Sequence, residues 1–250
     1  MFGLTKWFLT AFVACALLFV LLPRIDLYVS SLFYSPDESV FFLHRAPLVK
    51  FAYRAVPWIG RCVFVLLVVG LVVMFATRRR KLLGLERKAY LYLLLVLLLG
   101  PVFLVNTVLK DCWGRARPNE VVEFGGTKMF TPAFFVYEPF ETSGSWPSGH
   151  AAFGFYFVSF ALLLKKRRAL AMAAAVTLGS LIGLGRMVQG RHFLSDVVFA
   201  FFFVYMTARV LYYFLYEGKL ARAGRFRILE APSRRRETAE EGPERKTTEE

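Results

Sequence analysis

Three short motifs between positions 110 and 196 contain residue types that suit phosphoryl transfer. Their sequences are KDCWGRARP at 110–118, PSGH at 147–150 and GRMVQGRHFLSD at 185–196. Lysine and arginine neutralise phosphoryl oxygens, and the planar fork of arginine holds two oxygens at once. The motifs therefore predict a phosphate-binding site with three fixed cations, which are Lys110, Arg117 and Arg186.

Two histidines in these motifs could carry out the chemical steps. His192 lies four residues before Asp196, so the two side chains can meet on one helical turn. A carboxylate that holds one imidazole nitrogen leaves the other nitrogen able to attack phosphorus, which predicts a phosphohistidine intermediate. His150 lies at the start of a predicted helix, where it can protonate the leaving oxygen. We predict that His192, His150 and Asp196 are catalytic and that the reaction uses no metal and no cofactor.

The PSGH motif also lies where a predicted helix begins. Backbone N–H groups are unpaired at a helix N-terminus, so this position favours a bound anion. Ser148 can cap the helix or offer its hydroxyl, and Gly149 lets the backbone approach a ligand closely. We expect Ser148 and Gly149 to bind the substrate phosphate together with the three cations.

The elements that must position these motifs are apolar enough to lie in a bilayer. Of the 250 residues, 57% are hydrophobic, and the mean hydropathy is +0.50. A transmembrane helix needs about 20 apolar residues. The sequence predicts an all-α integral membrane bundle of six transmembrane helices, at 4–22, 57–77, 89–109, 150–164, 169–187 and 196–216. The run at 150–164 is short for a span.

The net charge of +14 is distributed in a way that indicates membrane topology. Basic clusters at 78–88, 165–168 and 219–227 fall on the same side of a six-helix topology. The positive-inside rule then places both termini in the cytoplasm and the motifs at the outer, periplasmic face. A nucleic-acid partner is disfavoured, because no continuous basic face remains for it.

The segments around the predicted helices have distinct compositions. Segment 25–56 mixes aromatic and basic residues, which favours an amphipathic interface helix that either covers the site or contacts the headgroup. The loop at 119–146 is long enough to cap the site. The first apolar run lacks a cleavage pattern, so we interpret it as a retained helix. We expect one domain at 1–217 and a disordered cytoplasmic tail at 218–250.

Each site residue also has a structural interpretation. Lys110 and Arg186 could be interface anchors at helix ends, and Arg117 could bind headgroups nonspecifically. A single histidine is more often structural, but two of the three histidines fall in the motifs. This coincidence favours function, whereas His44 lies outside the motifs and is expected to be structural.

Other residues in the motif loops have two interpretations each. Arg115 and Arg191 could bind a second phosphate or a sugar acid on the substrate, or they could be solvated loop charges. Cys112 could be a nucleophile, or a thiol that merely lies near Lys110. The three cysteines form neither a disulfide framework nor a zinc-ligand pattern.

The ordered motifs resemble the type 2 phosphatidic acid phosphatase (PAP2) family, whose pattern is KxxxxxxRP, PSGH and SRxxxxxHxxxD. The resemblance implies six membrane helices in a fold of the PAP2/haloperoxidase type, with His192 as nucleophile, His150 as acid and Asp196 as the residue that orients His192. It also implies a set of phosphate ligands, which are Lys110, Arg117, Ser148, Gly149 and Arg186. The chain has Gly185 where the family has serine, so we expect weaker phosphate contact without loss of activity.

Three stretches resemble the bacterial lipid A phosphatase branch of this family: GRARP, EFGG and FTPAF. The resemblance implies removal of a phosphate from a glucosamine disaccharide lipid at the periplasmic face of an inner membrane. Undecaprenyl pyrophosphate and phosphatidylglycerophosphate are alternative substrates. Vanadate haloperoxidases have a similar pocket but are soluble, and a lipid-phosphate binding or transport protein would not need His192 and Asp196. The oligomeric state does not follow from the sequence.

Overall fold

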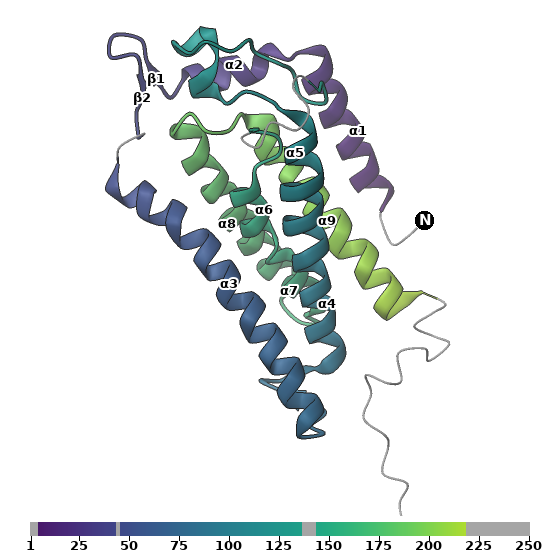
Figure 1. The fold of residues 1–250 in the computed structure, drawn as a ribbon. Coiled ribbons are helices and arrows are strands. Elements are labelled where there is room, and N and C mark those ends of the chain that lie inside the picture. Colours follow the sequence, from purple (N-terminus) through teal and green to yellow (C-terminus); the bar gives the residue numbers. More distant parts are fainter. Residues whose placement is uncertain (1–4, 44–45, 137–143, 219–250) are drawn as a thin grey trace, which may run out of the picture.

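The computed structural model of the protein describes residues 5–43, 46–136 and 144–218. Long helices form a bundle, and short helices, a hairpin and loops gather over one end of it (Figure 1). The longer helices are α1 (Lys6–Leu21), α2 (Arg24–Ser31), α3 (Pro47–Ala76), α4 (Arg87–Leu97), α8 (Arg168–Val188) and α9 (Leu194–Tyr212). The predicted tail at 218–250 lies outside the described residues apart from its first residue.

The shorter elements connect these helices or extend them. The helical ones are the π-helix η1 (Leu98–Leu109), α5 (Lys110–Trp113), the 3-10 turns η2 (Pro118–Glu120) and η3 (Val122–Phe124), α6 (Gly149–Phe155), α7 (Val158–Leu163) and the π-helix η4 (Tyr213–Glu217). Two antiparallel hairpins pair β1 (Tyr34–Ser35) with β2 (Val40–Phe41), and β3 (Lys81–Leu82) with β4 (Leu85–Glu86). The first hairpin lies at the end of the bundle where the motif loops gather.

The prediction of six transmembrane helices holds only in part. Within the described ranges, four helices are long and apolar enough to span a membrane, at Val49–Ala76, Arg87–Leu109, Arg168–Val188 and Leu194–Glu217. A fifth span is possible if α1 and α2 count as one, although the chain bends by 83° between them. The protein is therefore a largely helical membrane protein with four or five candidate spans.

The predicted fourth span is shorter than a membrane-spanning helix, and it lies in the interior of the bundle. The apolar stretch Gly149–Leu163 rises about 22 Å at 1.5 Å per residue, against about 30 Å of hydrocarbon. It breaks into α6 and α7, and both are largely buried among the other helices. A Cβ on Gly154 would collide with the backbone of Gly179, so these glycines let α6 and α8 approach closely.

The segment before the second span also differs from the prediction. We predicted a helix beginning at Pro57, but α3 begins at Pro47 and runs through Pro57. Pro47 lies in the first turn of α3, where the missing N–H of proline has no partner to lose. The extra turns place Lys50, Tyr53 and Arg54 on a continuous helix that extends toward the motif loops.

The N-terminal helix packs along α9 through aromatic rings. Phe12 contacts Phe199 and Phe202 edge to face, with centroids 5.7 and 5.4 Å apart. Phe19 is buried against Phe199. These contacts place α2, which follows, over the end of α9 where the third motif lies.

Candidate active site

The eight predicted site residues lie where helices begin or end, at the same end of the bundle. They are Lys110 at the start of α5, Arg117 before η2, Ser148, Gly149 and His150 at the start of α6, Arg186 in the last turn of α8, His192 before α9, and Asp196 in the first turn of α9. The Ser148 N–H donates to the carbonyl of Asp196 at 3.0 Å, which joins the second motif to the third. The charges of Lys110 and Arg186 both act on His192. The structure thus brings the three motifs together.

His192 is held in one tautomer by its neighbours. Its Nδ1 lies 2.8 Å from the carbonyl oxygen of Ser145 and 3.4 Å from Oδ2 of Asp196. A carbonyl oxygen only accepts, so Nδ1 carries the proton and Nε2 keeps its lone pair. Burial lowers the pKa of His192 to about 4, although the Asp196 carboxylate opposes this shift. The imidazole is therefore neutral at pH 7.

Asp196 is fixed by more partners than the sequence suggested. Its Oδ2 accepts from the backbone N–H of Phe193, the N-cap residue of α9, at 2.8 Å. Its Oδ1 accepts from Nη1 of Arg115 at 2.6 Å, and both side chains are fully buried. The sequence predicted that Asp196 orients His192. The closer partner of the imidazole is nevertheless the Ser145 carbonyl.

Arg115 occupies neither of the two positions that we considered for it. It is completely buried, so it is not a solvated loop charge and cannot reach a substrate sugar. Its Nε donates to the carbonyl of Thr131 at 2.9 Å, and its Nη1 donates to Ser195 Oγ at 2.8 Å. Its Nη2 forms an ion pair with Asp26 at 2.8 Å. The guanidinium thus lies behind the Asp196 carboxylate and joins it to α2.

Asp26 was missed by the sequence analysis. It lies in α2, is 1% exposed, and accepts from the Ser195 backbone N–H at 2.9 Å and from Ser195 Oγ at 2.5 Å. A single acidic residue in the short helix RIDLYVSS carries no signal by itself. The available signal was Arg115, an additional arginine in GRARP beside the expected phosphate ligand Arg117.

The start of α6 is tightly constrained. The Ser148 hydroxyl caps the helix and accepts from the Ala151 N–H at 3.4 Å. A Cβ on Gly149 would collide with the side-chain amide of Asn106 in the π-helix η1. Only glycine therefore lets η1 pack against the PSGH turn.

Tyr53 of α3 is a further site residue that the motifs do not contain. Its ring stacks on the His150 imidazole, with centroids 4.6 Å apart, and its carbonyl lies 3.2 Å from His150 Nε2. The guanidinium carbon of Arg186 lies 4.4 Å from the centroid of the same ring. Tyr53 thus fixes one residue of the second motif and one of the third. The mix of aromatic and basic residues in segment 25–56 was the sequence signal for it.

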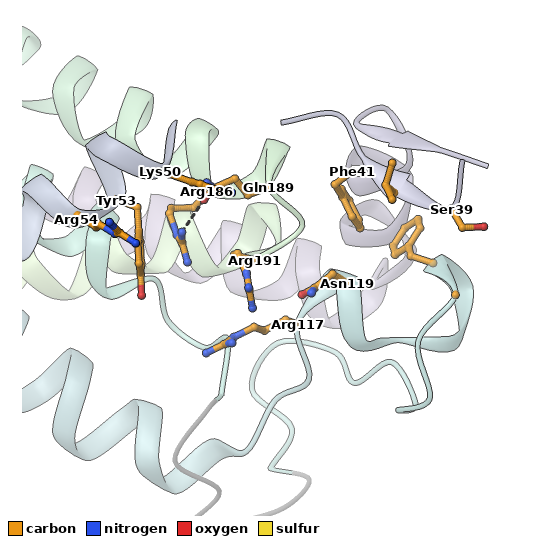
Figure 2. A pocket seen from close by; sticks show the side chains of 13 residues that line it. Ser39, Phe41, Lys50, Tyr53, Arg54, Arg117, Asn119, Arg186, Gln189 and Arg191 are labelled. Atoms are coloured by element: carbon orange, nitrogen blue, oxygen red, sulfur yellow. Dashed lines mark hydrogen bonds between the residues drawn. The ribbon is translucent and has the colours of Figure 1, made fainter. Parts of the chain in front are cut away.

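The cationic side of the site opens into a cavity of about 630 Å³ (Figure 2). Arg117 and Arg186 line it together with Arg191, and Figure 2 shows Arg191 pointing toward Arg117. Nη1 of Arg186 donates to the Gln189 side chain at 2.6 Å, while its Nε is buried without a hydrogen-bond partner. Arg117 lies 3.6 Å from Glu120. Guanidinium donors are thus available to an anion here.

His150 borders a second cavity. It holds about 450 Å³ and is lined mainly by apolar side chains from α3, α4, η1 and α6. Gly149, His150 and Asn106 contribute to its wall. Tyr53 lines the cationic cavity and His150 lines the apolar cavity, so this stacked pair connects the walls of the two cavities.

The remaining predicted residues are placed as follows. Gly185 has open space around it, since a Cβ there would meet no atom within 4 Å. Cys112 is a half-buried free thiol. His44 lies outside the described residues. Among the residues that the structure describes, no three His, Cys, Asp or Glu side chains are grouped so that they could hold a metal ion.

Comparison with known proteins identifies the family. A family model described as the PAP2 superfamily matches residues 89–219. A lipid A 4'-phosphatase of Francisella tularensis subsp. novicida is 34% identical over 205 residues, which cover 80% of this chain and 90% of that protein. A lipid A 4'-phosphatase of Rhizobium leguminosarum is 39% identical over 103 residues, covering 41% of this chain and 44% of that protein.

A third relative is named for a different activity. Phosphatidylglycerophosphatase B of Bacillus subtilis is 29% identical over 149 residues, covering 56% of this chain and 64% of that protein. No solved structure matches the chain significantly. The family match contains all eight predicted site residues, and the relative from Francisella aligns with most of the chain. The chain belongs to the PAP2 superfamily.

Proposed function

We propose that the protein is a membrane lipid phosphatase that forms a phosphohistidine on His192. The observation that carries this proposal is the tautomer of His192. Its Nδ1–H is bonded to the Ser145 carbonyl, so Nε2 has a lone pair next to Lys110 and Arg186. A neutral, oriented imidazole beside fixed cations is suited to attack a phosphoryl group.

The reaction then has two steps. In the first, Nε2 of His192 forms a bond to phosphorus, the ester P–O bond breaks, and His150 gives a proton to the leaving oxygen. Burial lowers the pKa of His150 to about 3 in the free protein, so His150 gains this proton when the anionic phosphate binds beside it. In the second, water attacks phosphorus, the P–N bond breaks, and His150 takes the proton from that water. The products are the lipid alcohol and inorganic phosphate. Asp196 shares the Nδ1–H and stabilises the positive charge that develops on His192.

The phosphate oxygens are bound by the protein's own donors. Lys110, Arg117 and Arg186 supply positive charge, and Ser148 and Gly149 supply the hydroxyl and backbone N–H of the PSGH turn. With these cations in place the reaction needs no metal ion. A chelator should leave phosphate release unchanged, and strong inhibition that added metal reverses would contradict this part of the proposal.

The substrate that we favour is lipid A. Two relatives are named lipid A 4'-phosphatase, and the alignment with the one from Francisella covers 80% of this chain. The apolar cavity beside His150 offers space for an acyl chain, while the cationic cavity faces a polar headgroup. The relative from Bacillus makes phosphatidylglycerophosphate the main alternative, and undecaprenyl pyrophosphate has the same reacting group.

We further propose that the site faces the periplasm of a bacterial inner membrane, with both termini in the cytoplasm. The support is the distribution of charge along the sequence, because the basic clusters fall on the opposite side of the predicted topology from the motifs. A lipid whose headgroup lies at the outer surface can then reach the site while its chains stay in the bilayer.

The proposal is tested by replacing His192 and assaying a panel of lipid phosphates. His192→Ala should release no phosphate while the purified protein keeps its thermal unfolding midpoint, and Cys112→Ser should serve as the active control. Acid-quenched protein should carry phosphate on His192 after reaction with a labelled substrate. Turnover by His192→Ala would refute the nucleophile assignment, and lipid binding without turnover in the wild type would favour a binding or transport protein.

A further inference from the structure

The cavity in Figure 2 contains more positive charge than one phosphate group requires. Five of the side chains that line it are cationic: Lys50, Arg54, Arg117, Arg186 and Arg191. None of its lining residues within the described ranges is Asp or Glu. Arg117 and Arg186 are already assigned to the phosphate that reacts, so three cations are left without a role.

Three of these cations lie close enough to repel one another. Arg117 and Arg191 both act electrostatically on Arg186, which is half-buried and whose Nε has no hydrogen-bond partner among the described residues. Glu120 offsets only Arg117, at 3.6 Å, and Gln189 is a neutral partner for Arg186. Grouped cations around a cavity raise the local concentration of anions and favour a bound one.

The shape of the cavity indicates what carries that anion. Its volume of about 630 Å³ is far larger than a phosphate group and falls in the ordinary range for small-molecule sites. Tyr53, Phe41 and Phe124 supply aromatic surface, and Asn119 and Gln189 supply amide groups. Apolar faces combined with a few amide donors and acceptors suit a sugar ring.

We propose that this cavity is a second anion site for the substrate headgroup. In it Arg191, with Lys50 and Arg54, binds a carboxylate or a second phosphate attached near the phosphate that is hydrolysed. The two anions must be neighbours, because Arg117 and Arg186 border both positions. This proposal rests on the proposed lipid phosphatase function and specifies its substrate as a lipid phosphate with an additional acidic group.

The test compares two lipid phosphates that share the reacting phosphomonoester. One carries an acidic sugar beside it and the other lacks that sugar. A hydrogen bond to a charged group contributes about 1.5–3 kcal/mol, so Arg191→Gln should reduce kcat/KM for the acidic substrate about 10- to 150-fold, mainly through KM. The loss for the substrate without the sugar should be clearly smaller.

The control is Arg24→Gln, which removes an exposed arginine from the start of α2, outside this cavity. It should leave the ratio of the two kcat/KM values unchanged. Inorganic phosphate serves as an inhibitor that reports the reacting site alone. Arg191→Gln should weaken its inhibition less than it weakens use of the acidic lipid.

Equal losses on both lipids, or no loss on either, would overturn the second anion site. If the wild type hydrolyses neither lipid, the proposed function fails, and binding then tests the site separately. In that case the two lipids are bound to His192→Ala and to His192→Ala/Arg191→Gln. Preference for the acidic lipid that disappears with Arg191 would support the site, and equal binding of both lipids would reject it.

Discussion

Replacing Arg115 with methionine should both destabilise the protein and slow catalysis. Methionine keeps much of the volume of the side chain but removes the guanidinium. The change takes away ion pairs to Asp196 at 2.6 Å and to Asp26 at 2.8 Å, where all three side chains are at most 1% exposed. It also leaves the Ser195 hydroxyl and the Thr131 carbonyl without a donor that they now have.

The expected size follows from this burial. Removing one partner of a buried ion pair costs about 3–5 kcal/mol, because the remaining charge stays desolvated. In a chain of this size 1 kcal/mol lowers the unfolding midpoint by about 2–4 °C, so Arg115→Met should unfold about 6–20 °C below the wild type. The matched control is Arg209→Met, because Arg209 also forms an ion pair of 2.8 Å, with the half-exposed Glu217. It should cost at most about 1 kcal/mol.

The measurements are thermal unfolding in detergent and steady-state phosphate release below the unfolding midpoint. Arg115 touches Asp196 and no substrate group, so Arg115→Met should lower kcat and change KM little. Asp26→Asn should cost less than Arg115→Met, because Arg115 keeps its pair with Asp196. The double variant should be more stable than the sum of the single losses predicts, by on the order of 0.5–3 kcal/mol.

Two results would refute this reasoning. A wild-type midpoint for Arg115→Met would mean that the buried network contributes no stability. A lowered midpoint with unchanged kcat in the folded protein would mean that Arg115 supports the fold but does not position the catalytic carboxylate.

Other parts of the site lead to further predictions. Gly149→Ala should lose activity and stability because its Cβ collides with the Asn106 amide, whereas Gly185→Ala should keep both because its Cβ meets open space. Burial lowers the pKa of His192 from 6.5 to about 4, so the folded state binds fewer protons than the unfolded chain between these values. The unfolding free energy should therefore rise with pH from about 4 to about 6.5. In thermal unfolding His192→Gln should reduce that rise and leave the part due to His150, whose pKa burial lowers to about 3. Reporter fusions at the C-terminus should score as cytoplasmic.

Each of these expectations has a result that contradicts it. Equal behaviour of the two glycine variants would mean that the PSGH turn tolerates a side chain. An unchanged pH profile for His192→Gln would assign the titration to another group. A periplasmic reporter would invert the topology and move the site to the cytoplasmic face.

The sequence predicted those parts of the site that depend on local spacing. The interval from His192 to Asp196 and the order of the three motifs required only the regularity of helices, and all eight residues meet at one end of the bundle. The membrane character followed from composition in the same way. The number of spans did not, because the apolar run from Gly149 to Leu163 is short and divides into two buried helices, and the first apolar run is followed by a bend of 83° into α2.

The residues that the sequence could not reveal interact across long separations. Arg115 and Asp26 are 89 positions apart in the sequence, and Tyr53 and His150 are 97 positions apart. No local pattern distinguishes a cation that will be buried behind a carboxylate from one on a solvated loop. That distinction depends on how α2 and α3 fold over the motifs, which is a property of tertiary packing.

The ion pair between Asp26 and Arg115 limits where the chain can be truncated. The family match begins at residue 89, so the recognisable module excludes both Asp26 and Tyr53. A chain trimmed to that module would keep every motif and lose the counter-ion and the aromatic ring that hold them in place. Grafts, truncations and chimeras of this protein should therefore be cut before α1, so that α2 and α3 stay with the motifs that they hold.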